Sequence, residues 1–210
     1  MSMLVRYLLT AILAYLLGSV SSGVLISRIT GNPDPRTLGS KSSGATNSLR
    51  TMGAKVGVAV LVCDALKAFI ACFMGWLLVD RVAAAAFPPY GRMLAAFFVI
   101  VGHIWPVFFQ FKGGKGVVCI MAAMLTCFPL PAAICILFGV LLVVITRYVS
   151  LGSISGVLLY ALFSIFWFGQ GNWIVMVWAC FLPALIIYCH RTNVVRLLHG
   201  KENKFGQKAK

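Results

Sequence analysis

Four polar segments interrupt an otherwise apolar chain, and they hold most of the residues that could do chemistry. Their sequences are GSKSSGATNSLRTMG at 39–53, FKGGKG at 111–116, RYVSLGS at 147–153 and HRTNVVRLLHGKEN at 190–203. Hydroxyl groups, amides and cations donate hydrogen bonds to an anion, and glycines let the backbone approach it closely. The composition of these segments therefore favours a ligand that carries phosphate.

The first segment combines side-chain donors with a possible helix start. Ser40 and Asn47 are donors, and the guanidinium of Arg50 is a fork that fits phosphate. Gly44 and Thr46 allow a helix to begin here, with its first N–H groups directed at an anion. A solvated loop followed by a helix cap is the alternative interpretation.

The segment FKGGKG is not a nucleotide-binding P-loop. Phe109 stands where that motif needs glycine, and Gly116 follows Lys115 where the motif needs serine or threonine. Lys115 can still supply a point charge, while Gly113 and Gly114 allow the backbone to approach an anion. The alternative is a glycine turn whose lysines only set the membrane topology.

The third and fourth segments place polar residues at helical spacing. Ser150 and Ser153 are three residues apart, and they either cap the next helix or bind a ligand at its start. His190, Asn193 and Arg196 are also three apart, so a helix would carry them on one face. An interfacial basic helix on anionic lipid explains the arginine but not the asparagine.

Asp64, Lys67 and His103 are polar ionisable residues that lie within apolar runs. Asp64 and Lys67 are three residues apart, and charges inside a membrane are costly unless they are paired. A salt bridge inside the helical bundle is therefore predicted for them. His103 either caps the cytoplasmic end of its helix or reaches the polar segments.

The overall composition defines a membrane protein with few acidic groups. Of the 210 residues 61% are hydrophobic and 10% are charged, which no soluble domain of this size could bury. The seven cysteines form no CxxC pair, so neither a disulfide framework nor a zinc site is expected. Four carboxylates in the whole chain supply a magnesium site or paired-carboxylate chemistry poorly. The formal charge of +14 is compatible with topology signals, anionic lipid or an anionic substrate.

Seven apolar runs are candidate membrane spans, and several of them are short, near the lower limit of about 17 residues. The runs are 3–27, 56–79, 93–109, 116–130, 131–146, 151–168 and 173–189, followed by a basic tail at 190–210. Pro129 and Pro131 interrupt the stretch 116–146, so two short helices joined by a tight turn are predicted there instead of one long helix. The sequence thus predicts an all-α polytopic bundle of about seven transmembrane helices, forming a single domain over 1–210.

Lysine and arginine are distributed unequally between the two sides of this arrangement. Fourteen of the 18 lie on one side, Lys67 lies inside a span, and three lie on the other side, namely Arg6, Arg81 and Arg92. Because positive charge accumulates in cytoplasmic loops, the N-terminus is predicted outside and the C-terminus in the cytoplasm. A cleaved signal peptide over the first run would break this rule. The four polar segments then share the cytoplasmic face.

Three of the polar segments resemble the signature motifs of a known family. GSKSSGATNSLRTMG, FKGGKGV and HRTNVVRLLHGKE are similar, in order and spacing, to the motifs of the acyl-phosphate-dependent glycerol-3-phosphate acyltransferases (PlsY). GHIWPVFFQ and RYVSLGS also resemble segments of that family, so the likeness extends from about Gly18 to Glu202. The resemblance implies a bacterial inner-membrane enzyme of phospholipid biosynthesis. Such an enzyme transfers a fatty acyl group from acyl phosphate to glycerol 3-phosphate and releases 1-acyl-glycerol 3-phosphate and phosphate.

The resemblance also implies site residues, carried over position by position. The residues expected to be catalytic are Ser40, Arg50, Lys115 and His190. The substrate-binding set contains these four together with Gly44, Ala45, Thr46, Asn47, Gly113, Gly114, Gly116, Ser153 and Asn193. The expected partners are the two small-molecule substrates and the lipid bilayer, with no nucleic acid, no metal, no cofactor and a monomeric chain.

The chemistry implied by the resemblance needs no covalent acyl-enzyme, because acyl phosphate is already activated. Lys115, Arg50 and backbone N–H groups are expected to stabilise the developing oxyanion and the departing phosphate. The proton of the glycerol hydroxyl passes either to His190 or to the substrate's own phosphate. The HxxxxD motif of other glycerolipid acyltransferases is absent, since Phe108, Val195 and Lys204 stand five residues after the three histidines.

Some residues depart from the family pattern, and two other functions compete with it. Ser42 replaces an asparagine, while Val118 and Cys119 replace alanine and threonine of the second motif. A transporter or channel for organic phosphate would use the same cations, but it should show polar access at both faces and internal repeats. A lipid-binding scaffold would use only the basic tail and leaves the segment 39–53 unexplained.

Overall fold

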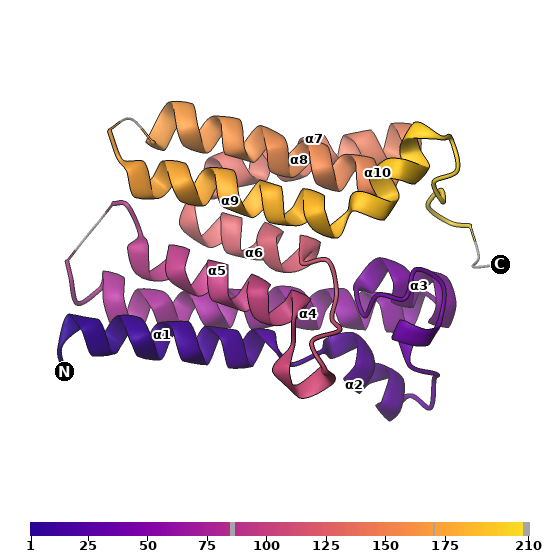
Figure 1. Cartoon of the computed structure of the whole chain (residues 1–210), viewed down its shortest axis with the longest axis horizontal. Helices are drawn as coiled ribbons and strands as arrows, with labels where there is room; N and C mark the ends of the chain where they lie inside the picture. Colours follow the sequence, from indigo (N-terminus) through magenta and orange to yellow (C-terminus); the bar gives the residue numbers. More distant parts are fainter. Residues whose placement is uncertain (85–86, 170, 208–210) are drawn as a thin grey trace. The chain divides into compact units, whose positions relative to one another are not determined.

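The computed structural model describes residues 1–84, 87–169 and 171–207, and their regular secondary structure is helical (Figure 1). The expected all-α class is confirmed. The chain divides into two compact units, Met1–Cys127 and Phe128–Gln207, which are treated one at a time below. Lys208 and Lys210, which the sequence assigns to the basic tail, lie outside the described residues.

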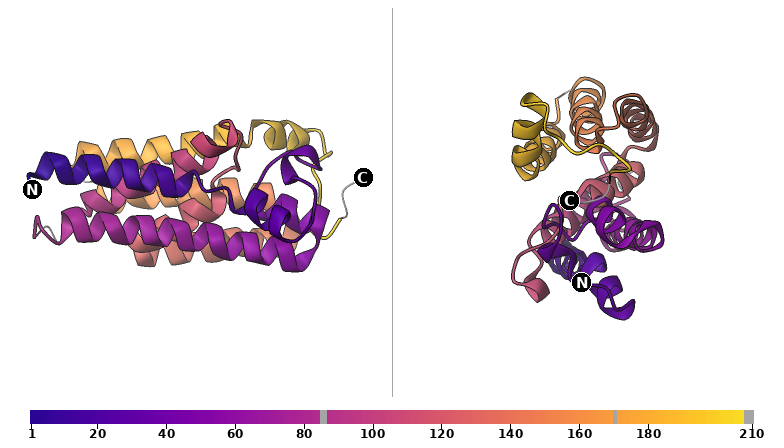
Figure 2. Two further views of the ribbon diagram at one scale, coloured as in Figure 1. Left: turned by 90° about the horizontal axis from the view of Figure 1, so that it is seen from below. Right: turned by 90° about the vertical axis from the view of Figure 1, so that its right-hand side faces the viewer.

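The first unit consists of helices from the N-terminal part of the chain. Its α-helices are α1 (Met3–Gly18), α2 (Ser22–Ile29), α3 (Ala45–Met52), α4 (Ala54–Gly75), α5 (Tyr90–Ile104) and α6 (Val117–Cys127). Its shorter elements are the 3-10 turns η1 (Pro35–Thr37) and η3 (Val107–Phe109) and the π-helical end of α4, η2 (Trp76–Asp80). Helices α1, α4 and α5 run side by side, and α6 packs on α4 and α5 (Figure 2).

Glycine allows two of these helices to approach closely. A Cβ atom added to Gly18 of α1 would meet the backbone of Val99 in α5, and one added to Gly102 of α5 would meet the carbonyl of Tyr15 in α1. Small residues at a crossing let helix backbones pack tightly in a membrane, where the hydrophobic effect does not drive association. This contact fixes the C-terminal half of α5, from whose end the FKGGKG segment departs.

The first apolar run is broken, which the sequence did not indicate. The run 3–27 was expected to be one helix, but α1 ends at Gly18 and α2 starts at Ser22. The ammonium of Lys67 in α4 donates to the carbonyls of Gly18 at 3.1 Å and Val20 at 2.8 Å. It thereby satisfies backbone acceptors that a helix end leaves without an intrahelical partner. The break therefore results from a long-range contact with α4.

The second unit is a smaller set of helices with an aromatic cluster. It contains α7 (Pro129–Thr146), α8 (Val149–Phe163) with the π-helical end η4 (Ser164–Phe168), α9 (Trp173–Cys189) and α10 (Arg191–Leu198). Helix α8 packs against both α7 and α9, as the end-on view of Figure 2 shows. The ring of Phe128 stacks on Phe168 with centroids 4.7 Å apart and also contacts Tyr160 and Trp178.

Five helical runs of the described residues are long and apolar enough to cross a bilayer, when α1 is counted with α2, α4 with η2, α5 with η3 and α8 with η4. These runs are Met3–Ile29, Ala54–Asp80, Tyr90–Phe109, Pro129–Thr146 and Val149–Phe168. The number is six if α9 and α10, which are bent by 65°, count as one span. Helix α6 is apolar but has only 11 residues. The predicted turn within 116–146 is confirmed, although α6 ends at Cys127 and α7 starts at Pro129, slightly earlier than expected. Proline is well suited to this first helical position because its missing N–H has no intrahelical acceptor there.

Candidate active site

The side chain of Asn47 organises the loop of the first motif. Its Nδ2 group donates to the carbonyls of Pro35 at 2.8 Å, Leu38 at 3.1 Å and Ser42 at 2.9 Å. Its Oδ1 atom accepts the N–H of Ser40 at 2.9 Å. The amide is 2% exposed and is engaged with the loop itself. Any contribution of the Asn47 side chain to ligand binding is therefore the positioning of Ser40 and its neighbours.

Helix α3 begins inside the first motif, as the sequence predicts. Gly44 is the N-cap, and Ala45 and Thr46 form the first turn with Thr46 exposed. The first N–H groups of a helix lack intrahelical acceptors and carry partial positive charge, which suits an anion. The hydroxyl of Ser42 accepts the N–H of Gly44 at 3.3 Å, so this serine supports the turn that precedes the helix.

The glycines of FKGGKG have a packing role that the sequence could not show. The N–H groups of Gly113 and Gly114 donate to the carbonyls of Ile104 and His103, both at 3.1 Å. A Cβ atom on Gly114 would collide with the imidazole of His103. Gly116 has a φ of +79°, a conformation that favours glycine. The segment is thus folded back onto the end of α5, and this contact determines the position of the Lys115 backbone.

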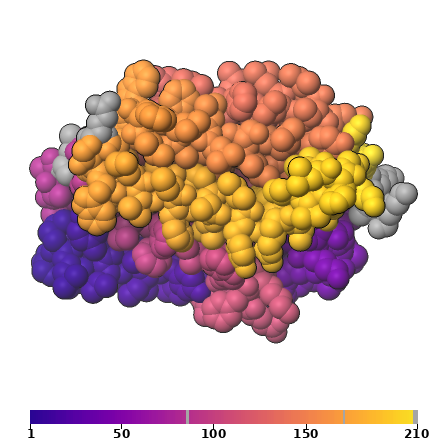
Figure 3. All heavy atoms as spheres, turned by 45° about the horizontal axis from the view of Figure 1, so that its top comes forward, coloured from indigo at the N-terminus to yellow at the C-terminus, as the bar shows by residue number. Residues whose placement is uncertain are grey.

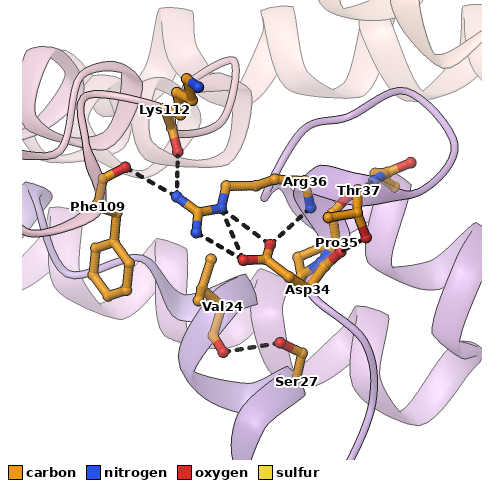
Figure 4. Close-up of polar contacts among 9 residues, drawn as sticks. Val24, Ser27, Asp34, Pro35, Arg36, Thr37, Phe109 and Lys112 are labelled. Carbon is orange, nitrogen blue, oxygen red and sulfur yellow. Dashed lines mark hydrogen bonds and ion pairs between the residues drawn. The ribbon is translucent and has the colours of Figure 1, made fainter.

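Arg36, which lies three residues before the first motif segment, contacts the loop that carries the second (Figure 4). Its guanidinium donates to the carbonyls of Phe109 at 2.9 Å and Lys112 at 3.5 Å. The same group is paired with Asp34, with 2.7 Å between Nη2 and Oδ2. The backbone of Ser43 also donates to the carbonyl of Gly113 at 3.4 Å. Two segments far apart in the sequence are therefore held together within the first unit.

The Asp34–Arg36 pair is a stable charged pair at neutral pH. The hydrogen bond from Arg36 holds the pKa of Asp34 below its ordinary value of 3.8, against the opposing effect of burial. The same hydrogen bond raises the pKa of Arg36. Asp34 also caps η1 by accepting the N–H of Arg36 at 2.9 Å. Sequence reasoning did not identify this pair, although an Asp-Pro-Arg sequence is a recognisable turn and cap signal.

His190 lies buried where α9 meets α10. Its Nδ1 atom is 2.9 Å from the carbonyl of Ile186, and since a carbonyl only accepts, Nδ1 carries the proton. In the neutral ring the unprotonated, basic nitrogen is then Nε2. The N-terminal turn of α10 places Asn193 one turn further along.

Glu202 accepts hydrogen bonds from several residues of and around the motif at 190–202, which is the third signature motif. The sequence analysis did not identify this residue as part of the site. Its Oε1 atom accepts from Asn193 at 2.6 Å and from Ser150 at 2.9 Å, and its Oε2 atom accepts from Arg196 at 2.9 Å. Asn193 and Arg196 do share one face of α10, as predicted. In Figure 3 the tail that follows α10 (yellow) packs against the segment between α7 and α8, where Arg147 and Phe205 are hydrogen-bonded. The sequence did offer one sign of this role, because Glu202 is the single acidic side chain in the strongly basic tail 190–210.

Burial and hydrogen bonding act in opposite directions on Glu202. Burial raises the pKa of this carboxyl, but the hydrogen bonds from Asn193, Arg196 and Ser150 outweigh it and leave the pKa below 4.5. Glu202 is therefore ionised at neutral pH. The carboxylate connects α8, α10 and the tail in one network.

The expected capping of α8 by serine is wrong. Tyr148 is the N-cap of this helix and makes no side-chain cap hydrogen bond. The hydroxyl of Ser153 donates to the carbonyl of Val149 at 2.8 Å, and Ser150 instead bonds to Glu202. The reason is that the helix starts at Val149, so both serines lie inside it. Ser153 is half-buried within the first two turns of α8.

The expected site residues fall into two sets. The first unit holds the loop and helix residues Ser40, Gly44, Ala45, Thr46, Asn47, Arg50, Gly113, Gly114, Lys115 and Gly116. Hydrogen bonds connect the two segments that carry them, and both Arg50 and Lys115 are half-buried. The second unit holds Ser153, His190 and Asn193. Of these, Asn193 is connected through Glu202 to Ser150 in α8.

These elements define a polytopic helical membrane protein whose polar motifs carry hydroxyl, amide and cationic groups. The chain belongs to the glycerol-3-phosphate acyltransferase family, because the sequence model of that family matches residues 8–200. Membership places it among the integral membrane acyltransferases of phospholipid biosynthesis.

Curated relatives agree with this assignment. The glycerol-3-phosphate acyltransferase of Thermoanaerobacter sp. (strain X514) is 40% identical over 201 residues, which cover 95% of this chain and 96% of the relative. The enzyme of the same name from Clostridioides difficile (strain 630) is 38% identical over 202 residues, covering 96% and 97%.

Solved structures agree as well. The crystal structure of PlsY (YgiH), an integral membrane glycerol 3-phosphate acyltransferase, in its glycerol 3-phosphate form has a TM-score of 0.82 and 37% identity. That match covers 95% of this chain and 96% of the other. The lysophosphatidic acid form has a TM-score of 0.79 and 35% identity, with 95% of each chain covered.

Proposed function

We propose that this protein transfers a fatty acyl group from acyl phosphate to glycerol 3-phosphate and releases 1-acyl-glycerol 3-phosphate and phosphate. The observation that supports this most strongly is the match, over 95% of the chain, to a PlsY structure in its glycerol 3-phosphate form. The three signature motifs of the acyl-phosphate-dependent family, present in order, support the choice of donor.

Phosphate binding is assigned to both motif segments of the first unit. The start of α3, at Gly44, Ala45 and Thr46, supplies N–H groups and the positive end of a helix dipole. Arg50 and Lys115 supply charge, and Ser40 supplies a hydroxyl donor whose backbone is fixed by Asn47. Because Gly113 and Gly114 use their N–H groups on α5, they contribute by shaping the loop, together with Gly116, and not by donating to phosphate.

Catalysis is attributed to positioning and electrostatics. The oxygen of the glycerol hydroxyl attacks the acyl carbon, and the bond from that carbon to the phosphate oxygen breaks, so phosphate leaves with the electron pair. Lys115 and Arg50 stabilise the developing oxyanion and the departing phosphate. Ser153 and Asn193 of the second unit serve the same reaction, as the resemblance of RYVSLGS and of the motif at 190–202 to the family implies. No metal or cofactor takes part in this scheme.

The hydroxyl proton has two candidate acceptors. His190 is one, because donation from Nδ1 to Ile186 assigns the lone pair to Nε2. The phosphate of the substrate is the other. In both versions the proton count balances, since the hydroxyl loses one proton and the acceptor gains it.

The proposed topology has seven spans, with α6 and α9 crossing in addition to the five longer helices. The N-terminus lies outside and the C-terminus in the cytoplasm, so that the motifs meet glycerol 3-phosphate in that compartment. The protein resides in the bacterial inner membrane as a monomer, and the acyl chain lies among its helices. This arrangement explains why an enzyme with a water-soluble substrate is embedded in lipid.

One assay separates the competing functions. Purified protein is mixed with palmitoyl phosphate and labelled glycerol 3-phosphate, and labelled 1-acyl-glycerol 3-phosphate is the expected product. Parallel reactions with acyl-CoA and with acylated acyl carrier protein as donors should give none. If product formed with acyl-CoA or the carrier protein but not with palmitoyl phosphate, acyl phosphate would not be the donor. If proteoliposomes took up glycerol 3-phosphate without acylating it, the protein would be a transporter.

A further inference from the structure

We propose that Asp64, Lys67 and His103 form a buried cluster that positions the loops of the first two motifs, so that all three are positioning residues for the reaction. The inference rests on the proposed function, because it assigns these residues a role in holding the binding loops of that enzyme. All of the residues involved belong to the first unit.

One carboxylate oxygen is the centre of the cluster. Oδ1 of Asp64 lies 3.0 Å from the ammonium of Lys67, 3.5 Å from Nδ1 of His103 and 2.9 Å from the hydroxyl of Ser22, which donates to it. The side chains of Asp64, Lys67 and His103 are 2%, 5% and 6% exposed. The predicted Asp64–Lys67 salt bridge is therefore confirmed, and it is part of a larger network.

His103 extends the network to the second motif. Its carbonyl accepts the N–H of Gly114 at 3.1 Å, and its ring fills the space that a side chain at position 114 would need. Because Asp64 holds Nδ1, the ring orientation against Gly114 is determined by the cluster. A rotation of this ring would displace Gly114 and the adjacent Lys115.

Lys67 and Ser22 extend the network to the first motif. Lys67 binds the carbonyls of Gly18 and Val20 at the end of α1, and Asp64 binds Ser22 at the start of α2. The cation thus lies at the negative end of one helix and the carboxylate at the positive start of the next. The neighbouring Gly23 is packed on the carbonyl of Ser43 in the first motif.

Ser43 connects the contacts that run through α2 with the contacts that run through His103 and the second motif. Its carbonyl lies against Gly23 of α2, and its N–H donates to Gly113 of the second motif. Each motif segment is therefore in contact with an element that the cluster holds. Asp64 therefore both binds the start of α2 and holds the His103 ring in place.

A metal ion is a weaker explanation of the same cluster. Asp64, His103 and Cys119 place one ligand atom each within 4.8 Å of one another. The ammonium of Lys67, however, lies on the same Asp64 oxygen that would bind a metal, and it already neutralises the carboxylate. The thiol of Cys119 donates to the backbone carbonyl of Asp64 at 3.5 Å, which is a packing contact.

Two variants and one control test the proposal in the full-length protein. His103→Ala removes the ring beneath Gly114, and the double variant Asp64→Asn with Lys67→Met removes the pair without leaving a lone buried charge. The control is Asp80→Asn. Asp80 is 3% exposed, pairs with Arg92 at 3.0 Å and lies roughly 24 Å further along the same helical run, at about 1.5 Å per residue.

The direct measurement is amide hydrogen exchange of the peptide that contains Gly113 and Gly114, in nanodiscs and without substrate. We expect faster exchange there in His103→Ala and in the double variant, but not in Asp80→Asn. Unchanged exchange in both test variants, or an equal change in the control, would overturn the proposal. This readout does not depend on turnover, so it remains decisive if the proposed function fails.

The second measurement separates positioning from a loss of folded protein. In a wild-type protein that makes 1-acyl-glycerol 3-phosphate, we expect the two test variants to lose about 10- to 100-fold in kcat/KM, mainly through KM for glycerol 3-phosphate. Asp80→Asn should change only the amount of active enzyme and leave KM unchanged. A normal KM in the test variants would contradict the inference while leaving the proposed function intact.

Discussion

His190 is the side chain whose chemical role can be separated from its structural one. Its Nδ1 atom donates to Ile186, and Nε2 is the basic nitrogen of the neutral ring. If His190 accepts the hydroxyl proton, His190→Ala should reduce kcat by about 10²- to 10⁴-fold at saturating substrate. The measurement is initial rates with palmitoyl phosphate over a range of glycerol 3-phosphate concentrations. Near-normal turnover at saturation would assign the proton to the substrate phosphate.

Glu202 gives the protein a predictable response to acid. Its folded-state pKa lies below 4.5 because Asn193, Arg196 and Ser150 donate to the carboxylate. A carboxyl with a lowered folded pKa stabilises the fold above its unfolded pKa, and this contribution disappears as the pH falls through the folded pKa. Glu202→Gln should therefore destabilise the folded protein at pH 7 by about 1–3 kcal/mol.

The difference between wild type and Glu202→Gln should shrink as the pH is lowered below about 4.5, the ordinary pKa of this group. Thermal unfolding in detergent, followed at several pH values, measures it. The matched control is Lys201→Gln, which changes an exposed neighbour outside this network. A constant difference between wild type and Glu202→Gln from pH 7 to pH 3 would show that the carboxylate charge is not what stabilises the tail.

At the scale of elements, Arg36 joins the loop before α3 to the loop that follows α5, and a substitution there tests whether this contact matters. Its planar guanidinium binds Asp34, Phe109 and Lys112 at once, and an ammonium cannot reproduce that geometry. Arg36→Lys should therefore raise KM for glycerol 3-phosphate by roughly tenfold, equivalent to about 1.4 kcal/mol. Steady-state kinetics measure this, and Arg28→Lys, on an exposed position of α2, should leave KM unchanged. Equal KM values for both variants would show that this bridge does not position the loops.

Contacts between near neighbours were predictable from the sequence, and contacts between distant elements were not. The Asp64–Lys67 pair follows from helical spacing, and the turn before α7 follows from two prolines. The break after Gly18 depends on a lysine in another helix, and the packing of Gly114 depends on the His103 ring. The sequence shows where the glycines are. Why glycine is needed at a position depends on which backbone or ring packs against it, and only the folded structure shows that.

The candidate site shows the same division. The start of α3 at Gly44 could be predicted because the residues that form it are adjacent. The roles of Asn47 and Glu202 could not, since their partners are loop carbonyls and side chains brought together only by folding. For the same reason residue chemistry alone predicts fewer site residues than the resemblance to the family motifs implies.

For the whole molecule, the charge distribution makes a prediction about orientation. The positive-inside rule places the C-terminal tail in the cytoplasm and the N-terminus outside. An epitope tag after residue 210 should be reached by antibody only after the inner membrane is permeabilised, and a tag before residue 1 should be reached in spheroplasts. A C-terminal tag that is accessible in intact spheroplasts would separate the third motif from the first two, and the proposed reaction could not then occur.

The junction of α1 and α2 imposes an order on biosynthesis. The carbonyl of Val20 obtains its donor from Lys67, which the ribosome adds 47 residues later. Until α4 has been synthesised and inserted, the carbonyls of Gly18 and Val20 lack this donor, and an unsatisfied backbone carbonyl is costly wherever water is excluded. We therefore expect the junction of α1 and α2 to acquire its native form only after α4 has been inserted beside it.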